Sequence, residues 1–143
     1  MTGTVHPVMF EVLTLIPDGE ALAANEFSAV AMLDLKDVPK RGHLHTATLV
    51  SSGGSLTTPA GTLYCFDSDP GIVAHQTELG VGNHCKQLAK FPVAVTDWDK
   101  IAGAASIIFT GLFHFERGDG LWFAFRTMAP WAANEVLNVD VVG

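Results

Sequence analysis

The chain has 143 residues, with 8 Lys and Arg, 15 Asp and Glu, a formal net charge of −7 and a hydrophobic fraction of 48%. This length fits one domain, and the apolar content excludes an intrinsically disordered polypeptide. The acidic balance, with no basic cluster beyond Lys40-Arg41, argues against direct nucleic-acid binding. No apolar run reaches the roughly 18 to 20 residues of a bilayer-crossing helix, so no membrane partner is expected. We expect one domain over residues 1–143, opening with an extended segment at residues 1–7.

Short runs of β-branched and aromatic residues, closed by Gly, Pro, Asn or Asp, predict strands. The first run ends at Pro17-Asp18-Gly19, a sequence typical of a tight turn. Residues 121–125 carry the largest aromatic content, which predicts a strand buried on both faces. In chain order, the strands expected from these runs cover residues 8–16, 27–35, 43–50, 63–66, 89–95, 105–109, 120–128 and 136–142.

Only two stretches compete as helix. Residues 72–80 could form a turn or two, and residues 97–105 another, with Asp97 or Asp99 as the N-cap. Both are too short for the crossover that joins parallel strands. The pattern therefore predicts an all-β fold, a single-domain antiparallel β-sandwich or jelly roll of about eight strands.

Two cysteines allow at most one internal disulfide, and a chain of this length needs none to hold its core. We expect both to be reduced, with Cys65 a small buried thiol in an apolar strand. Cys85 lies in a polar stretch beside His84 and Lys86, which could lower its pKa. A nucleophile also needs an oriented base and an oxyanion site, and the sequence identifies neither of them.

His43 and His45 are two residues apart on an expected strand, so both would share one face within reach of a common metal ion. A stable site needs three or four ligands, and the sequence fixes only these two. Asp67 and Asp69 surround a tight turn that could hold Ca²⁺ with further oxygen ligands. The favoured interpretation is structural: exposed polar histidines, and Asx turns that end a strand. We therefore expect no metal or other cofactor.

No nucleophile elbow, phosphate-binding glycine loop or zinc-protease motif occurs in the chain, so no residue motivates an enzymatic reaction. The low charge density instead suits a surface covered by neighbouring chains. Candidate contact residues are Phe113, Phe115 and Trp131, and core packing is the alternative for Trp131.

Several short motifs occur in a recognisable order. They are Ala21-Leu22-Ala23-Ala24-Asn25-Glu26, Leu63-Tyr64-Cys65-Phe66-Asp67-Ser68-Asp69-Pro70, Asp97-Trp98, Leu121-Trp122-Phe123-Ala124-Phe125 and Val139-Asp140-Val141. This order resembles small structural proteins of tailed bacteriophages that are encoded beside the major capsid protein. The resemblance covers about residues 21–142, and its most recognisable piece is the aliphatic strand that runs into Phe-Asp-x-Asp-Pro.

The resemblance implies a β-sandwich or jelly roll that serves as a capsid cement or decoration protein. Such a protein binds the major capsid protein lattice on the capsid exterior of the virion, as a homotrimer, after synthesis in the cytoplasm of a bacterial host. No functional residue carries over, because the motifs mark strands and turns. Two alternatives stay open: a tail- or fibre-associated carbohydrate-binding module that uses Trp98 or Trp131, and a small cupin-like metal enzyme that uses His43 and His45.

Overall fold

The computed structural model describes residues 10–34, 41–53, 58–78, 87–116 and 120–142. These residues form nine strands and one short 3-10 helix, and no helix among them is long and apolar enough to cross a membrane. The elements are β1 Phe10–Ile16, β2 Ala31–Asp34, β3 Arg41–Gly53, β4 Gly61–Phe66, β5 Gln87–Val93, η1 Val95–Asp97, β6 Asp99–Ile101, β7 Ala104–Glu116, β8 Gly120–Thr127 and β9 Glu135–Val142.

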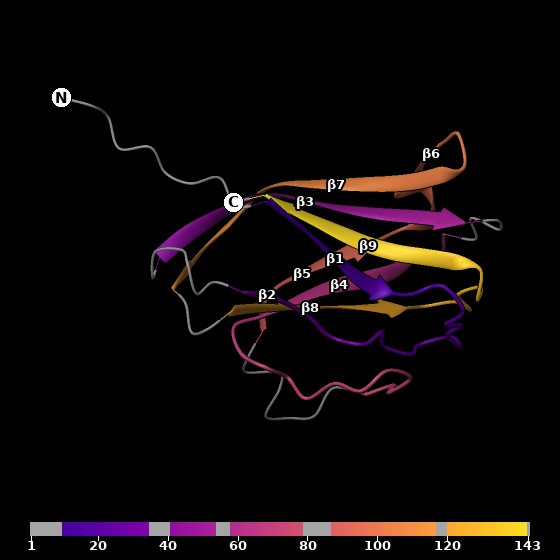
Figure 1. The fold of residues 1–143 in the computed structure, drawn as a ribbon, viewed down its shortest axis with the longest axis horizontal. Helices are drawn as coiled ribbons and strands as arrows, with labels where there is room; N and C mark the ends of the chain where they lie inside the picture. Colours follow the sequence, from indigo (N-terminus) through magenta and orange to yellow (C-terminus); the bar gives the residue numbers. More distant parts are fainter. Residues whose placement is uncertain (1–9, 35–40, 54–57, 79–86, 117–119, 143) are drawn as a thin grey trace.

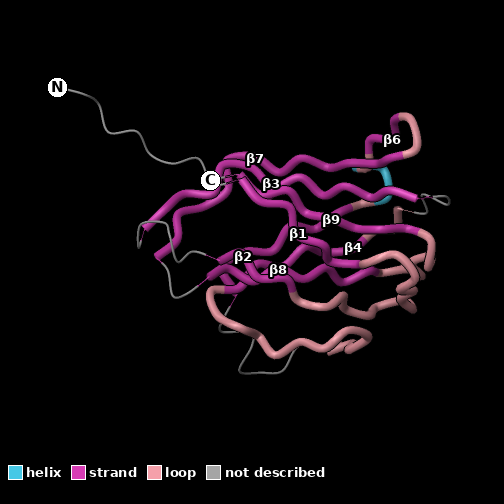
Figure 2. The backbone as a smooth tube through the Cα atoms, viewed as in Figure 1, coloured by secondary structure: helices cyan, strands magenta, loops and turns pink. Residues whose placement is uncertain are grey.

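The strands form two antiparallel sheets that pack face to face (Figure 1). The first sheet, sheet A, has the order β1-β9-β3-β7-β6, and the second, sheet C, has the order β2-β8-β4-β5. Strands from the two ends of the chain meet in sheet A, because β9 lies between β1 and β3. The tube in Figure 2 shows that long loops accompany sheet C, whereas sheet A is almost entirely strand. The predicted all-β sandwich is confirmed, and each expected strand corresponds to a strand of the structure.

Neither of the two stretches that compete as helix forms an α-helix in the residues that the structure describes. Residues 95–97 form only a 3-10 turn, in which the Ala94 amide donates to Asp97 Oδ2 at 2.7 Å, so Asp97 closes the turn instead of capping a longer helix. The strand β6 follows, and Ala102 and Gly103, both with positive φ, join β6 to β7 as a two-residue hairpin. Over the described residues 72–78 the chain is irregular, since His75 has a φ of 75°, which no right-handed helix contains.

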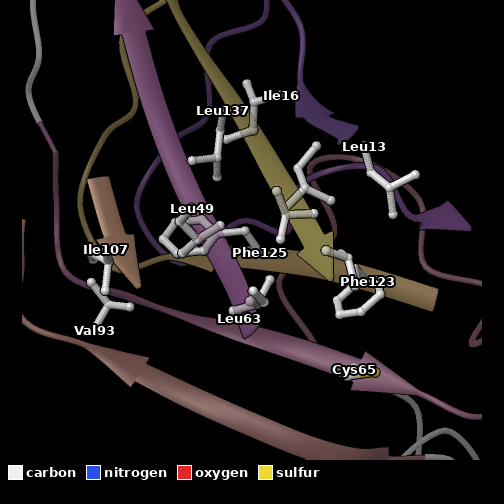
Figure 3. Packing of buried hydrophobic residues seen from close by; sticks show 14 of the residues in the cluster. Leu13, Ile16, Leu49, Leu63, Cys65, Val93, Ile107, Phe123, Phe125 and Leu137 are labelled. Atoms are coloured by element: carbon white, nitrogen blue, oxygen red, sulfur yellow. The ribbon is translucent and has the colours of Figure 1, made fainter. Parts of the chain in front are cut away.

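One apolar core fills the space between the sheets, and Figure 3 shows its central side chains. Leu49 from sheet A and Leu63, Phe123 and Phe125 from sheet C are fully buried. Burial of a side chain of this size stabilises the fold by roughly 1.5 to 3 kcal/mol. The strands β4 and β8 approach closely at Gly61, where a Cβ atom would lie 2.4 Å from Cζ of Phe125, so only glycine fits there.

Cys65 lies in this core as a free, buried thiol, as the sequence predicts. Burial raises its pKa, and the nearby charge of Asp67 raises it further. A thiol that stays protonated and covered is inert as a nucleophile. Cys85 lies outside the described residues.

Candidate functional site

The outer face of sheet A has no described loop across it, and we call it the open face. Its central rows run across β1, β9, β3 and β7 in direct register and alternate with the buried residues of the same strands. The members of these rows are Val12, Asp140, Thr48 and Ile108, then Thr14, Asn138, Val50 and Ser106. Val12 and Ile108 are 56% and 64% exposed, so two large apolar side chains stand in water on a mostly small, polar surface.

Asp140 is the ionisable residue of these rows, on the central strand β9 between Val12 and Thr48. Its Oδ1 is buried and has no hydrogen-bond partner among the described residues. Its neighbours in the next row satisfy each other, because Thr14 Oγ1 donates to Asn138 Oδ1 at 2.8 Å. A buried carboxylate oxygen that accepts no hydrogen bond lowers the stability of the fold by about 1 to 3 kcal/mol. The open face therefore holds an acceptor at Asp140 that lacks a donor among the described residues.

Two edges of the sandwich differ in character: the edge formed by β5 in sheet C, and the edge formed by β6 and β7 in sheet A. In sheet C the edge strand β5 carries Lys90 and Pro92 and a bulge at Leu88, the devices with which proteins prevent unwanted strand pairing. In sheet A the short β6 pairs only with residues 104–106 of β7, so the described part of the chain leaves residues 107–116 of β7 unpaired on that side. From Ile107 to Phe115 this edge has neither proline nor an Asp, Glu, Lys or Arg residue.

The strands β3 and β7 continue past the sandwich as a two-stranded ribbon, residues 41–45 and 111–116. The neighbouring strand β9 ends at Val142, opposite Thr46, and the ribbon begins there. Figure 1 shows the start of β3 and the end of β7 leaving the body of the sandwich beyond that point. The predicted strand position of His43 and His45 is confirmed, and the candidate contact residues Phe113 and Phe115 lie opposite Leu44 and Gly42 on the same ribbon.

The outer face of sheet C is covered, in contrast to that of sheet A. A second apolar cluster lies there, made by Phe66, Tyr64, Trp122 and Ala124 of the sheet and by Phe27, Val30 and Ile72 of the loops. Residues 67–78, which we call the strap, run across this covered face (Figure 2). The expectation that residues 121–125 are buried on both faces is therefore largely fulfilled, although Trp122 keeps partial exposure.

Backbone and ring contacts hold the strap in place. The Phe27 amide donates to the Gln76 carbonyl at 2.8 Å, and the His75 amide donates to the Phe27 carbonyl at 2.9 Å. The Phe27 ring contacts Tyr64 with ring centroids 5.5 Å apart, and Cζ of the Arg126 guanidinium lies over the Phe27 ring, 5.8 Å from its centroid. Phe27 is thus the residue that joins strap, loop and sheet.

A histidine between two carboxylates closes the strap. His75 Nδ1 lies 2.9 Å from Glu26 Oε1, and His75 Nε2 lies 2.7 Å from Glu20 Oε1. The hydrogen bond with Glu26, followed by that with Glu20, raises the pKa of His75. The hydrogen bond from His75, followed by that from the Ala23 amide, lowers the pKa of Glu26. The carboxylates occupy opposite ring nitrogens, so the three groups do not converge on one point as metal ligands must.

The two tryptophans singled out by the sequence are buried in their own chain. Trp131 is 1% exposed, packs edge-on against Phe125 and donates from Nε1 to the Glu135 carbonyl at 2.9 Å. Trp98 is 6% exposed and donates from Nε1 to the Pro59 carbonyl at 3.2 Å. Trp131 therefore packs in the core, the alternative given above, because its apolar ring is buried and its N–H group has a hydrogen-bond acceptor within the chain. Neither indole offers a face for stacking on a sugar, which corrects the carbohydrate-binding alternative.

Asp69 forms the expected Asx turn, because its Oδ1 accepts the Gly71 amide at 2.8 Å. Asp67 Oδ1 accepts the Ser68 hydroxyl at 3.1 Å. Among the side chains that the structure describes, no group of three or more His, Cys, Asp or Glu residues could hold a metal ion. Sequence reasoning missed the contact of His75 with Glu20 and Glu26, because these residues meet only through the packing of two loops on sheet C.

The fold and these surfaces define a small two-sheet β-sandwich with one covered face, one open face and a projecting ribbon. No family model and no curated protein matches the chain. Among solved structures, the "SPBc2 prophage-derived protein YomS" aligns with 99% of this chain and 98% of its own, at 12% sequence identity and a TM-score of 0.35.

Proposed function

We propose that this chain is a non-enzymatic structural protein of a bacteriophage virion, a cement or decoration protein that binds the major capsid protein lattice as a homotrimer. The sequence resemblance supplies the class, and the β-sandwich that the resemblance implies is the fold of this chain. The observation that carries the proposal further is the contrast between the guarded edge of β5 and the unguarded edge of β7.

An unpaired, uncharged edge strand is a template for pairing with another chain, and soluble proteins protect such edges unless they use them. In β5 the chain carries that protection, with Lys90 and Pro92. In β7 it does not, over a stretch that includes the predicted contact residues Phe113 and Phe115. We infer that β7 is the edge that pairs with a neighbouring chain.

A closed trimer requires a heterologous interface, in which one patch meets a different patch on the next copy. The edge of β7 and the open face are two such patches on one molecule, and they adjoin at Ile108. A cement protein also gains from several weak contacts at once, since each further contact to the lattice is effectively intramolecular. Few charges then have to be desolvated, because Asp140 is the ionisable residue in the central rows of the open face.

The test is electron microscopy of intact particles, with purified protein measured by light scattering. The proposal expects density of this sandwich on the outer shell, where capsomers meet, and a solution mass of about three chains. A monomer that shows no density on particles and does not bind empty capsids overturns it.

A matched pair of variants locates the contact. Ile108→Lys places a charge on the exposed side of β7, and Leu88→Lys places one on the guarded edge β5, where Leu88 is 37% exposed. We expect Ile108→Lys to lower trimer formation or capsid binding at least about tenfold, because a lysine must be desolvated or excluded at the pairing edge. Leu88→Lys should behave as the unmodified chain. Equal behaviour of the two variants contradicts the assignment of the edge.

A further inference from the structure

The open face of sheet A presents carboxylates and no described basic group. Its two central rows hold one carboxylate, that of Asp140. On β6 the exposed Asp99 lies opposite Ser106, an outward residue of β7, so its carboxylate belongs to the same face. Lys100 alternates to the other side of β6. None of the outward residues whose side chains the structure describes is Lys or Arg, so this part of the face is negatively charged.

Asp140 lies on a central strand of this face and lacks a donor for one carboxylate oxygen. Its Oδ1 is buried and accepts no hydrogen bond within the described chain. Val12, beside it on β1, has no donor in its side chain, and Thr48, beside it on β3, gives none to Oδ1. The residue as a whole keeps partial exposure, so a group from outside can reach the carboxylate. Nearly all buried acceptors in native proteins have a donor, and this one has to receive it from outside the described chain.

Exposed apolar side chains accompany Asp140 on the face. Val12 is 56% exposed and lies one strand away, about 4.8 Å in the direction of the ladder. Ile101, 66% exposed and opposite Ala104, extends the apolar area onto β6. A lysine or an arginine has the matching form, because its charged head follows an aliphatic stem that packs on apolar surface.

A second copy of this chain does not complement the face in the simplest arrangement. A twofold axis that passes near Asp140 would stack two open faces so that this carboxylate opposes its own copy. Like charges that oppose one another across an interface weaken it. The net charge of −7 also repels copies at long range and attracts basic surfaces. A different chain that carries basic groups therefore fits the face better than a copy does.

We propose that the open face docks on the major capsid protein, and that a lysine or an arginine of that protein binds the Asp140 carboxylate. The ammonium or guanidinium group donates to Oδ1, and its stem packs on Val12. Ile108 lies where the edge of β7 adjoins the face and belongs to contacts between copies, whereas Asp140, two strands further in, faces the lattice. This inference rests on the proposed function, because it names the contact through which the cement protein holds the lattice.

The test measures binding to empty capsids that lack this protein, with Asp140→Asn as the variant. The amide keeps the size of the side chain and removes its charge, so we expect capsid binding to weaken at least about tenfold. Glu78→Gln, on the strap, makes the same change in net charge and should bind as the unmodified chain. Urea denaturation should show that Asp140→Asn is folded and no less stable than the unmodified chain, because Oδ1 has no donor in the described chain to lose.

Salt dependence is a second measurement that does not require the variant to fold. Capsid binding of the unmodified chain should weaken as the NaCl concentration rises, because ions screen a charge pair at the rim of an interface. Where Asp140→Asn folds, its residual binding should depend less on salt. Binding of the unmodified chain that does not change with salt contradicts the charge pair.

The outcomes separate this inference from the proposed function. An unmodified chain that does not bind capsids overturns both. Equal binding of Asp140→Asn and the unmodified chain overturns this inference alone, since solvent then satisfies the carboxylate. Equal weakening in Asp140→Asn and Glu78→Gln overturns it as well, because net charge then explains the effect. A loss of trimer mass in Asp140→Asn overturns it too, because the donor then belongs to a second copy.

Discussion

The two outer faces of this sandwich follow the same strand alternation and end in opposite ways. In sheet C the outward positions hold Tyr64, Phe66 and Trp122, and the loops and the strap cover them. In sheet A the outward positions hold Thr48 and Asn138 beside the exposed Val12 and Ile108, and no described segment crosses them. Aromatic side chains on an outer face have to be covered by other residues to be removed from solvent, whereas a face made mostly of Thr, Ser and Asn can stay exposed to solvent. The described loops therefore cover the outer face of one sheet and leave the outer face of the other exposed.

This contrast predicts where mutations change stability and where they change association. Residues on the covered face should affect unfolding, because they pack within the chain. Residues on the open face and on the edge of β7 should affect contacts between chains, because nothing in the described chain packs on them.

The largest expected effect is on the covered face. Phe27 is 2% exposed and joins the strap, Tyr64 and Arg126. Phe27→Ala should lower the free energy of unfolding by about 3 to 5 kcal/mol, since it removes a buried ring and leaves a cavity. Urea denaturation followed by circular dichroism measures the change.

Ile108→Ala is the matched change on the open face. Its side chain is 64% exposed, so we expect a stability change within about 0.5 kcal/mol. Comparable losses for the two variants would mean that the outer faces are equally packed, which would remove the basis for treating the face of sheet A as open.

The sequence predicts much of this fold because strands of a half-buried sheet carry their own signal. The alternation in residues 43–50 and the run 121–125 mark their strands directly. It fails at β6, where Ala102-Gly103 makes a two-residue hairpin without the Asn-Gly or Asp-Gly pair that usually marks one. Sequence-based prediction also fails at the strap, because no local sequence pattern marks the positive φ of His75.

The site residues divide along the same line. The strand position of His43 and His45 is predictable because their spacing is local. The meeting of His75 with Glu20 and Glu26 spans two loops that pack on sheet C, and no local pattern marks it. The indoles of Trp98 and Trp131 look like contact residues in sequence because a loop position does not reveal that the ring folds inward.

An intermediate effect is expected on the open face at Asp140. Its buried Oδ1 has no hydrogen-bond partner in the described part of the chain and lies on a central strand. Asp140→Thr therefore removes this acceptor and adds a β-branched residue. The free energy of unfolding of the isolated chain should rise by about 1 kcal/mol, measured by urea denaturation at neutral pH.

The same variant tests the open face as a contact surface. If a neighbouring chain supplies a donor to Asp140, the substitution should stabilise the isolated chain and weaken association in the same preparation. A lower stability of the isolated variant would show that the carboxylate already has a favourable environment within the chain.

The smallest effect is the pH dependence of the strap. The raised pKa of His75 means that its contribution is complete below its ordinary value of 6.5 and is lost as the pH rises through the raised value. The lowered pKa of Glu26 means that its contribution is complete above 4.5 and is lost as the pH falls through the lowered value. The contact is therefore strongest between about pH 4.5 and 6.5 and weakens as the pH rises through the raised pKa of His75.

His75→Asn isolates this contribution, because asparagine tolerates the positive φ at this position but carries no charge. The charged groups that contact His75 and shift its pKa are Glu20 and Glu26 on the facing loop. Amide hydrogen exchange at Phe27 and His75 should be slower in the unmodified chain than in His75→Asn at pH 5.5, with the difference shrinking by pH 8.5. The effect should be modest and sensitive to salt, because the imidazole is 49% exposed. Glu78→Gln should keep the pH dependence of the unmodified chain, and a difference that grows with pH would mean that the imidazole holds the strap without its charge.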